Sequence, residues 1–417
     1  MRWSNLAIVS FVFLASCVRG VQPAGPPVDG PPRQPTIRVG LLVDTTSAIL
    51  GATTELEILD GVTRAPLLAV PAGDSLRVEA AGSNLVLVSP RERTVVGGLL
   101  IARATAGGFL LIGGHSYRGI ATLRVSTLGR LTVVNEVDME KYLLGVVPYE
   151  IGRVGPELLE ASKAQAVAAR TYAFRYLGRR DSLGFDVFAT VEDQVYGGAE
   201  GEHPPVSEAV LATAGEILTY QGQPIEAYYH STCAGQTAAI EGVWPQEAPR
   251  PYLVSVVDRN PETGEAFDST SSRFRWTQRW TASEINGILA RTLADSLPPG
   301  TAAVGTLQDM QVVERTQSGR IGRMVITTSG GAFAVGGDRI RWILPTQSGA
   351  ILNSSMFDVT LERDSRGELT AVVATGGGWG HGIGMCQVGA MGRARAGQDY
   401  LRILRTYYPS TQITKLY

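Results

Sequence analysis

Three polar segments carry the side chains of this 417-residue chain that are suited to chemistry. The first holds Glu150, which follows the apolar run from Leu144 to Val147. Apolar surroundings disfavour an ionised carboxyl and raise its pKa, which suits a general acid at neutral pH. A carboxylate near the start of a helix is also favoured by the helix dipole. The residues alone leave both interpretations of Glu150 open.

The other two segments are loops. Residues 228–237 read YYHSTCAGQT, a dense set of hydrogen-bonding and nucleophilic side chains after the strand-like GEILTY, and this is typical of a loop that lines a site. Residues 376–390 are rich in glycine, which permits a close approach of the backbone to a ligand, and Trp379 and His381 are their only large groups. The glycine-rich loop lacks the Lys-Ser/Thr ending of a phosphate loop.

The elements that must position these segments differ along the chain. Short apolar runs punctuated by Gly and Asn predict a β-rich region from 37 to about 130. An Ala-, Leu- and Glu-rich stretch with an early proline predicts a helix over 156–177, a Thr-Ala-Ser-Glu capping box predicts another from 281, and a last helix is expected at 400–407. Strand-like runs return around these helices. The mixture indicates an α+β fold over the rest of the chain.

Composition excludes several classes of protein. With 44% hydrophobic and 18% charged residues, the chain is too apolar to be disordered. Its 37 basic and 39 acidic residues give a net charge of −2, so no overall field favours nucleic acid as a partner.

The amino terminus predicts export. An apolar run from Leu6 to Leu14 has the length of a signal-peptide core and ends in Leu-Ala-Ser-Cys, which resembles a bacterial lipobox. We therefore expect a signal peptide at 1–16, lipidation of Cys17, and a Gly/Pro-rich tether over 17–36 that holds a membrane-anchored lipoprotein in the cell envelope. An ordinary signal peptide that happens to contain a cysteine is the alternative.

Motifs spread over more than half of the chain resemble the SpoIID/LytB family. They are LTVVNEVDMEKYLLGVVPYEIG from Leu131, ELLEASKAQAVAARTYAFR from Glu157, DQVYG from Asp193, YHSTCAG from Tyr229, the segment from Gly380 to Ala390, and YLRILRTYYP from Tyr400. The resemblance implies a peptidoglycan lytic transglycosylase with a catalytic body over 131–417 and Glu150 as catalytic acid. Ile151 and Gly152 depart from the family's usual Met and Pro beside it.

One carboxyl group is enough for that reaction. Glu150 would protonate the glycosidic oxygen and then, as carboxylate, deprotonate the MurNAc C6 hydroxyl, giving a 1,6-anhydro end. Glu192 or Asp193 would supply a second carboxylate if the protein were instead a hydrolase. Lys163 and Arg170 are as well suited to ion pairs as to substrate contacts. The residues expected to bind or orient the sugar are Gln194, Tyr196, His230, Ser231, Thr232, His381 and Gln387.

Cys233 and Cys386 stand where many relatives carry serine, one in each loop of the expected site. A Cys233–Cys386 disulfide suits an exported protein. A zinc site of His230, Cys233, His381 and Cys386 is equally sound chemically, although the reaction requires no cofactor. Free buried thiols are the third interpretation, and a cysteine nucleophile ranks last.

The rival to an enzyme is a non-catalytic binding module. The resemblance extends to the family's amidase-enhancer branch, whose members would dock on peptidoglycan or on an amidase partner.

Overall fold

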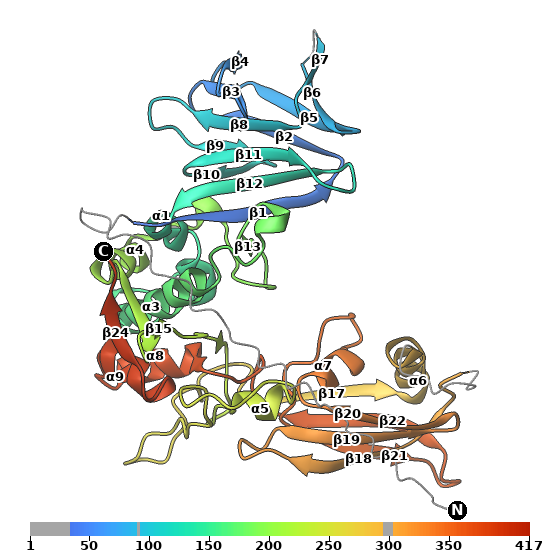
Figure 1. Ribbon diagram of the computed structural model, residues 1–417. Helices are drawn as coiled ribbons and strands as arrows, with labels where there is room; N and C mark the ends of the chain where they lie inside the picture. The colour runs from blue at the N-terminus through green and yellow to red at the C-terminus, as the bar shows by residue number, and fades with distance from the viewer. Residues whose placement is uncertain (1–33, 90–91, 295–302) are drawn as a thin grey trace, which may run out of the picture. The chain divides into compact units, whose positions relative to one another are not determined.

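The computed structural model describes residues 34–89, 92–294 and 303–417 (Figure 1). The predicted signal peptide, Cys17 and almost all of the predicted tether lie outside these residues. Helices and strands are mixed over the described residues, and the predicted α+β class is confirmed. Within this part of the chain, no helix is both long enough and apolar enough to cross a bilayer.

Two β-sheets form the amino-terminal part, as the short apolar runs predict. Their strands are β1 (Thr36–Thr45), β2 (Ser47–Ala52), β3 (Leu56–Asp60), β4 (Pro66–Val70), β5 (Ser75–Ala81), β6 (Asn84–Val88), β7 (Arg93–Val96), β8 (Leu99–Ala104), β9 (Leu110–Ile112), β10 (His115–Tyr117), β11 (Ile120–Val125), β12 (Leu131–Asp138) and β13 (Val187–Phe188). The strand orders are β13-β1-β12-β11-β8-β3-β4 and β10-β9-β2-β5-β6-β7. The carboxyl end of β12 leads directly into the helices that carry Glu150.

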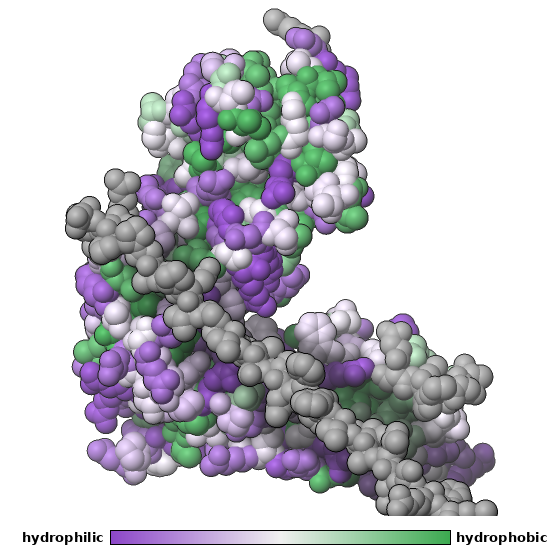
Figure 2. Space-filling model, in the orientation of Figure 1, coloured by the Kyte–Doolittle hydropathy of each residue, from purple (hydrophilic) through white to green (hydrophobic). Residues whose placement is uncertain are grey.

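Alternation of side chains explains these strands. In β5, Leu76 and Val78 are buried and Ser75 and Arg77 are exposed, since successive side chains of a strand point to opposite faces. The turn to β6 is closed by Gly82 at φ +61°, a conformation that glycine adopts without strain. Some apolar side chains stay exposed on the edge strands β4 and β7, and Figure 2 shows such apolar patches among polar ones.

A group of helices, 3-10 turns and short strands follows in the middle and at the end of the sequence. They are α1 (Met139–Leu144), α2 (Val147–Glu150), α3 (Leu159–Arg175), α4 (Pro204–Ala212), α5 (Ile240–Val243), α8 (Gln387–Arg395) and α9 (Tyr400–Tyr407), with 3-10 turns η1 (Pro156–Leu158), η2 (Asp181–Leu183) and η3 (Gly198–Gly201) and short strands β14 (Glu216–Tyr220), β15 (Gln223–Pro224), β16 (Tyr229–His230), β23 (Met385–Cys386) and β24 (Gln412–Lys415). The helices expected at 156–177 and 400–407 are confirmed, the first opening with a 3-10 turn.

Helix α3 is the centre of this region. Its alanines at 161, 164, 166, 168, 169 and 173 are fully buried, because α4, α8, α9 and β14 all pack against it. Small side chains allow elements to approach the helix on several sides.

A separate hydrophobic core lies between residues 276 and 376. It is built by β17 (Trp276–Thr281), α6 (Ala282–Thr292), β18 (Leu307–Arg315), β19 (Ile321–Thr328), β20 (Gly331–Gly336), α7 (Arg339–Ile343), β21 (Phe357–Arg363) and β22 (Leu369–Gly376). The predicted capping box is confirmed: Thr281 Oγ1 accepts a hydrogen bond from the Glu284 amide, and Glu284 accepts one from the Thr281 amide. The body predicted over 131–417 thus contains a unit with its own core.

A buried ion pair fastens α3 to α1. Arg170 is fully buried, and its Nη2 and Nε lie 2.6 and 2.8 Å from the carboxylate oxygens of Glu140. We expect Arg170→Met to lower the free energy of unfolding by about 3–5 kcal/mol, because Glu140 would stay buried without its cation. Urea denaturation measures the loss.

The matched control is Lys141→Met. Lys141 pairs with Asp138 in solvent, where an ion pair contributes less than about 1 kcal/mol. Equal losses in the two variants would contradict a structural role for the Arg170 pair.

Candidate functional site

Glu150 is the last residue of α2. Helix α1 is capped by Gly145, where a Cβ atom would lie 2.6 Å from the Gly198 carbonyl oxygen and 2.7 Å from the Tyr196 ring. A larger residue at position 145 would clash with the segment that follows Asp193, so this close approach requires glycine. Pro148 occupies the first turn of α2, where its missing amide removes no helical hydrogen bond. This local geometry directs the half-buried Glu150 side chain toward the backbone of Val195.

The Glu150 carboxyl group is surrounded by hydrogen-bond donors. The Val195 amide donates to Oε1 at 3.1 Å and Gln387 Nε2 donates to Oε2 at 3.3 Å, while the Tyr229 hydroxyl also hydrogen-bonds to the carboxyl. Burial raises the pKa of Glu150 above its usual value, and the three donors offset only part of this effect. The group can therefore hold a proton at a higher pH than an exposed glutamate, as a general acid requires.

Gln194 and Tyr196 are buried beside Glu150. Gln194 Nε2 donates to the Tyr229 hydroxyl at 2.8 Å, and its Oε1 accepts from Tyr142 at 3.1 Å. The Tyr196 hydroxyl donates to Asn135 Oδ1 at 2.9 Å. These bonds orient the surroundings of the acid, and direct contacts of Gln194 and Tyr196 with a sugar stay a prediction.

A short parallel ladder brings the two predicted loops together. Tyr229 in β16 pairs with Met385 in β23, and His230 pairs with Cys386. The Val388 amide donates to the Ser231 carbonyl oxygen at 3.0 Å just beyond the ladder. Because Gln387 follows Cys386 directly, this register delivers its amide group to Glu150.

The remaining predicted sugar-binding residues surround this ladder. Ser231 is half-buried, and its hydroxyl lies 3.2 Å from that of the buried Thr232, which contacts the Ser271 hydroxyl at 2.8 Å. The ring of His381 lies 5.6 Å from that of His230, and its Nδ1 accepts a hydrogen bond from the Ile383 amide at 3.0 Å. Burial lowers the pKa of His381 to about 4, so its imidazole is neutral at pH 7.

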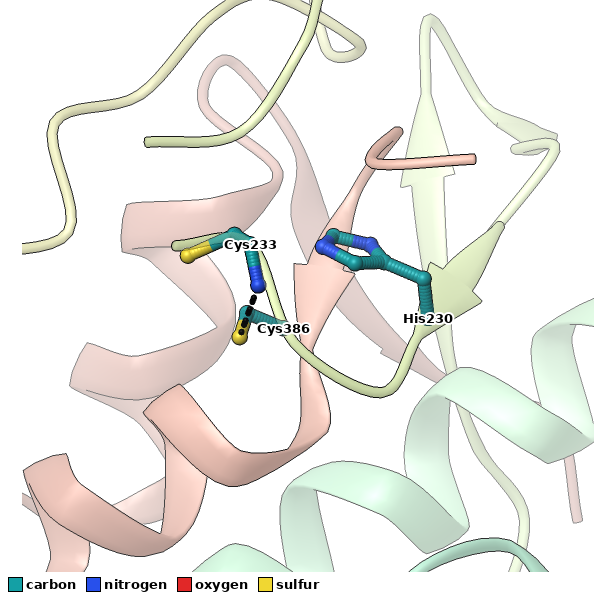
Figure 3. A group of neighbouring side chains, drawn as sticks. All are labelled: His230, Cys233 and Cys386. Carbon is teal, nitrogen blue, oxygen red and sulfur yellow. Dashed lines mark hydrogen bonds between the residues drawn. The ribbon is translucent and has the colours of Figure 1, made fainter. Parts of the chain in front are cut away.

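His230, Cys233 and Cys386 form a buried cluster (Figure 3). Their potential ligand atoms all lie within 4.8 Å of one another, and the His230 ring points toward the two cysteines. His230 Nδ1 donates to the Ile383 carbonyl oxygen at 3.1 Å, which leaves the lone pair of Nε2 without a partner in the described structure. Burial holds the pKa of His230 well below its usual value. Of the four predicted zinc ligands, the structure gathers these three and leaves His381 outside the group.

The two cysteines are free thiols in this structure. Cys386 Sγ accepts hydrogen bonds from the amides of Cys233 at 3.2 Å and Gly389 at 3.3 Å. Burial raises the pKa of both thiols, which disfavours a thiolate nucleophile in the absence of a cation.

Two buried aspartates lie next to the thiols, and the sequence did not mark either of them as a site residue. Cys233 Sγ lies 3.3 Å from Asp258 Oδ2, and Cys386 Sγ lies 3.8 Å from Asp268 Oδ2. Asp258 also pairs with the buried Arg393, while Asp268 Oδ1 has no partner among the described residues. The aspartates stand in an irregular segment without periodicity, so no local pattern marks them.

Tyr229 was also missed as a partner of Glu150, although it stands beside His230 in a loop already singled out. The buried Arg320 was also not predicted near the site. It comes from the unit with its own core, and it donates hydrogen bonds to the carbonyl oxygens of Gln236 at 3.1 Å and Cys233 at 3.4 Å. Contacts of this kind join residues far apart in sequence.

Fold and site together place the Glu150 carboxyl, whose pKa is raised by burial, where three segments of the chain meet. A family model described as Stage II sporulation protein (SpoIID) matches residues 127–220, and a domain of unknown function (DUF8618) matches residues 261–384. The second match contains the whole of the separate core. The chain belongs to the SpoIID family, which confirms the resemblance found in its motifs.

Similar proteins carry three kinds of name. An uncharacterized protein of Brachyspira hyodysenteriae is 33% identical over 74% of this chain and 75% of its own length. The stage II sporulation protein D of Bacillus subtilis is 31% identical over 68% of this chain and 76% of its own length. The amidase enhancer of Bacillus subtilis is 32% identical over 65% of this chain, but the match covers only 40% of that protein.

The raised pKa of Glu150 predicts a pH-dependent stability difference. The folded state binds the proton more tightly than the unfolded state, so ionisation above the folded pKa destabilises the protein. Glu150→Gln should therefore be more stable than the wild type at about pH 8, and this advantage should vanish below about pH 4, where the carboxyl is protonated in both states.

Urea denaturation at both pH values measures this difference. Glu157→Gln is the control, since Glu157 is exposed and precedes the same helix α3. An effect of Glu150→Gln that does not change with pH would show that burial does not govern the proton on Glu150.

Proposed function

We propose that this protein cleaves the glycan strands of peptidoglycan at the MurNAc–GlcNAc bond, as a lytic transglycosylase with Glu150 as its single acid and base. The observation that carries the proposal is the state of Glu150, whose pKa is raised by burial while three donors hold its carboxyl in place. Membership of the SpoIID family supports it.

The reaction would proceed in two proton transfers. Protonated Glu150 gives its proton to the glycosidic oxygen as the bond from that oxygen to C1 of MurNAc breaks. The resulting carboxylate takes the proton of the C6 hydroxyl on the same MurNAc, and the C6 oxygen bonds to C1. Glu150 is protonated again and no water is consumed. The attacking hydroxyl belongs to the bound substrate, so proximity replaces an activated water.

The surroundings of the two carboxylates considered for a hydrolase favour the single-acid route. The Asp193 side chain is buried and occupied by Arg180 at 2.9 Å, the Tyr172 hydroxyl at 3.0 Å and the Phe188 amide at 2.8 Å. Glu192 is exposed to solvent. Asp193 is occupied by these partners and Glu192 lies in solvent, which supports Glu150 alone as the proton donor.

The buried cluster is suited to zinc. His230, Cys233 and Cys386 offer one imidazole nitrogen and two sulfurs, a donor set that zinc prefers, and the unpartnered Nε2 of His230 is the atom that a metal would use. The cation of Arg320, beside the Cys233 carbonyl, would offset part of the charge of two thiolates. When bound, the ion would tie the two site loops together. A Cys233–Cys386 disulfide would serve the same purpose in an oxidising compartment.

The proposed substrate agrees with an exported location. Peptidoglycan lies outside the cytoplasm, and the Leu-Ala-Ser-Cys sequence before residue 18 supports a lipid anchor on Cys17 in the cell envelope. The balanced charge of the chain gives no support to nucleic acid as a partner.

The competing function is an amidase enhancer without catalytic activity, in which the protein binds peptidoglycan or an amidase. The similarity to a protein of that name supports this alternative. It assigns no proton transfer to Glu150, and the two functions therefore differ in the effect of changing this one residue.

Glu150→Gln decides between them. We expect the purified wild type to release 1,6-anhydro-MurNAc ends from stem-stripped peptidoglycan, and the variant to release about 10²- to 10⁴-fold less, the usual contribution of a general acid. Mass spectrometry of the soluble products measures both. Glu157→Gln, which changes an exposed glutamate, should match the wild type. Equal release by wild type and Glu150→Gln would refute the catalytic role.

Metal analysis tests the cluster. In a Cys17→Ser protein, we expect close to one zinc per chain and two thiols that react only after the metal is removed by a chelator. Cys386→Ser should lose most of the zinc. A metal-free protein with the mass of an intramolecular disulfide would favour the bridge, and a metal-free protein with two reactive thiols would refute both.

A further inference from the structure

A buried glutamine on α3 is connected to Glu150 through one other side chain. Gln165 is fully buried, and its Oε1 lies 3.4 Å from Gln387 Nε2. The same Gln387 nitrogen donates to Glu150 Oε2 at 3.3 Å. The amide group of Gln387 therefore stands between the oxygen of Gln165 and the carboxyl group of Glu150.

The packing of α3 brings Gln165 to this place. Its neighbours one turn before and one turn after on the same face of the helix are Ala161 and Ala169, and both are fully buried. Helix α8, which begins at Gln387, packs against α3. Because the alanine side chains are small, α8 can approach α3 closely enough for Gln165 and Gln387 to meet in the interior.

Hydrogen bonds decide how the Gln387 amide is turned, because the two ends of a glutamine amide have nearly the same shape. A carboxylate can only accept hydrogen bonds, so Gln387 must turn its NH2 group toward an ionised Glu150. This NH2 group carries two hydrogens, and Gln165 Oε1 accepts the second one. If Gln387 were turned round, its oxygen would face two other acceptors.

Gln165 holds its own side chain by the oxygen end. Its Nε2 has no partner among the described residues, so the bond that Oε1 accepts from Gln387 is the contact that uses this amide. The 17-residue helix α3 provides a rigid base for the side chain. A carbonyl oxygen at this point stabilises one orientation of the Gln387 amide and opposes the other.

We infer that Gln165 is a positioning residue, which fixes the side-chain amide of Gln387 so that an N–H group, and not the carbonyl oxygen, faces Glu150. An apolar side chain at position 165 would allow Gln387 to turn its oxygen to the carboxyl group. The importance of this orientation for catalysis rests on the proposed function, whereas the orientation itself does not.

The orientation of Gln387 changes the proton affinity of Glu150. Burial raises the pKa of Glu150, and the hydrogen bond from Gln387 lowers it. A carbonyl oxygen in the place of this donor would favour the protonated carboxyl, which can donate a hydrogen bond to it. Loss of Gln165 should therefore raise the pKa of Glu150 further.

Other ionisable groups around Glu150 keep their charge state over the relevant pH range. The hydroxyls of Tyr142 on α1 and Tyr229 on β16 face Glu150, and burial raises the pKa of both well above its usual value, so both stay neutral below about pH 9. The charged side chains of α1, α3, α4 and α8 are either exposed or held in ion pairs. The pairs that are not exposed are Glu140 with Arg170, Glu160 with Lys163, and Arg393 with Asp258.

Carbon-13 NMR measures the titration of Glu150 in the purified protein. Glutamate is labelled at its side-chain carboxyl carbon, and the Glu150 signal is the one that Glu150→Gln lacks. We expect Gln165→Met to move the midpoint of this titration upward by about one pH unit, since a hydrogen bond to a charged group is lost or reversed. Gln165→Asn, which withdraws the acceptor without adding an apolar group, should move it in the same direction.

Gln387→Met shows whether Gln165 acts through Gln387. This change removes the amide and should by itself move the midpoint upward, because one donor to Glu150 is lost. Adding Gln165→Met to it should have no further effect, because no amide is left to orient.

Thr171→Val is the matched control on the same helix. The buried Thr171 hydroxyl accepts a hydrogen bond from the Leu218 amide at 2.9 Å. Its loss should lower the urea concentration at which the protein unfolds and leave the titration of Glu150 unchanged.

Two results would overturn the inference. One is a midpoint that stays unchanged in both Gln165 variants, and the other is a Gln165→Met shift of the same size with and without the Gln387 amide. Failure of the proposed function gives a different result: a wild type that releases no anhydro ends, while the titration of Glu150 still depends on Gln165 through Gln387. If both proposals hold, the alkaline limb of kcat/KM for release of anhydro ends moves upward in Gln165→Met together with the midpoint.

Discussion

The parallel pairing of β16 with β23 is the constraint on which the candidate site depends. It joins Tyr229 to Met385 and His230 to Cys386, residues more than 150 positions apart, and it fixes the register of both loops at once. Gln387 reaches Glu150, and Cys233 meets Cys386, only because this register holds. A shift by one residue would turn these side chains to the opposite face of the ladder.

A long segment separates β16 from β23 in the sequence, and it includes the separate core. The two strands can still pair because the ends of the separate core are themselves paired. Strands β17 and β22 run antiparallel, so Trp276 lies opposite Gly376 where the chain enters and leaves the separate core. With its ends side by side, the unit closes a loop whose entropic cost grows only slowly with length. Its own hydrophobic core stabilises it internally. It can therefore be present in this chain and still bring Arg320 to the carbonyl oxygens of Gln236 and Cys233.

Local patterns in the sequence predicted the helices and strands, but they could not predict contacts between residues far apart in the sequence. The helix at 156–177, the capping box at Thr281 and the β-runs follow from periodicity and end signals, which each element carries by itself. The separate core was missed because its strands look like any others in sequence. Glu150 was predicted as the catalytic acid from its apolar neighbours and the family motif, and that role stays a prediction. Its contacts with Tyr229 and Gln387 depend on a ladder between distant segments, which no local pattern reveals.

The surroundings of Glu150 combine two opposing effects, and a single acid–base group requires both. Desolvation favours the protonated carboxyl and would leave it a poor base if nothing opposed it. The Val195 amide and Gln387 Nε2 favour the carboxylate, and each donates to a different oxygen, so a negative charge on the carboxylate is stabilised on both atoms. These donors come from the irregular segment after Asp193 and from the first residue of α8, so the fold itself holds them against the carboxyl group. Such preorganisation lowers the cost of forming the carboxylate without abolishing the acid.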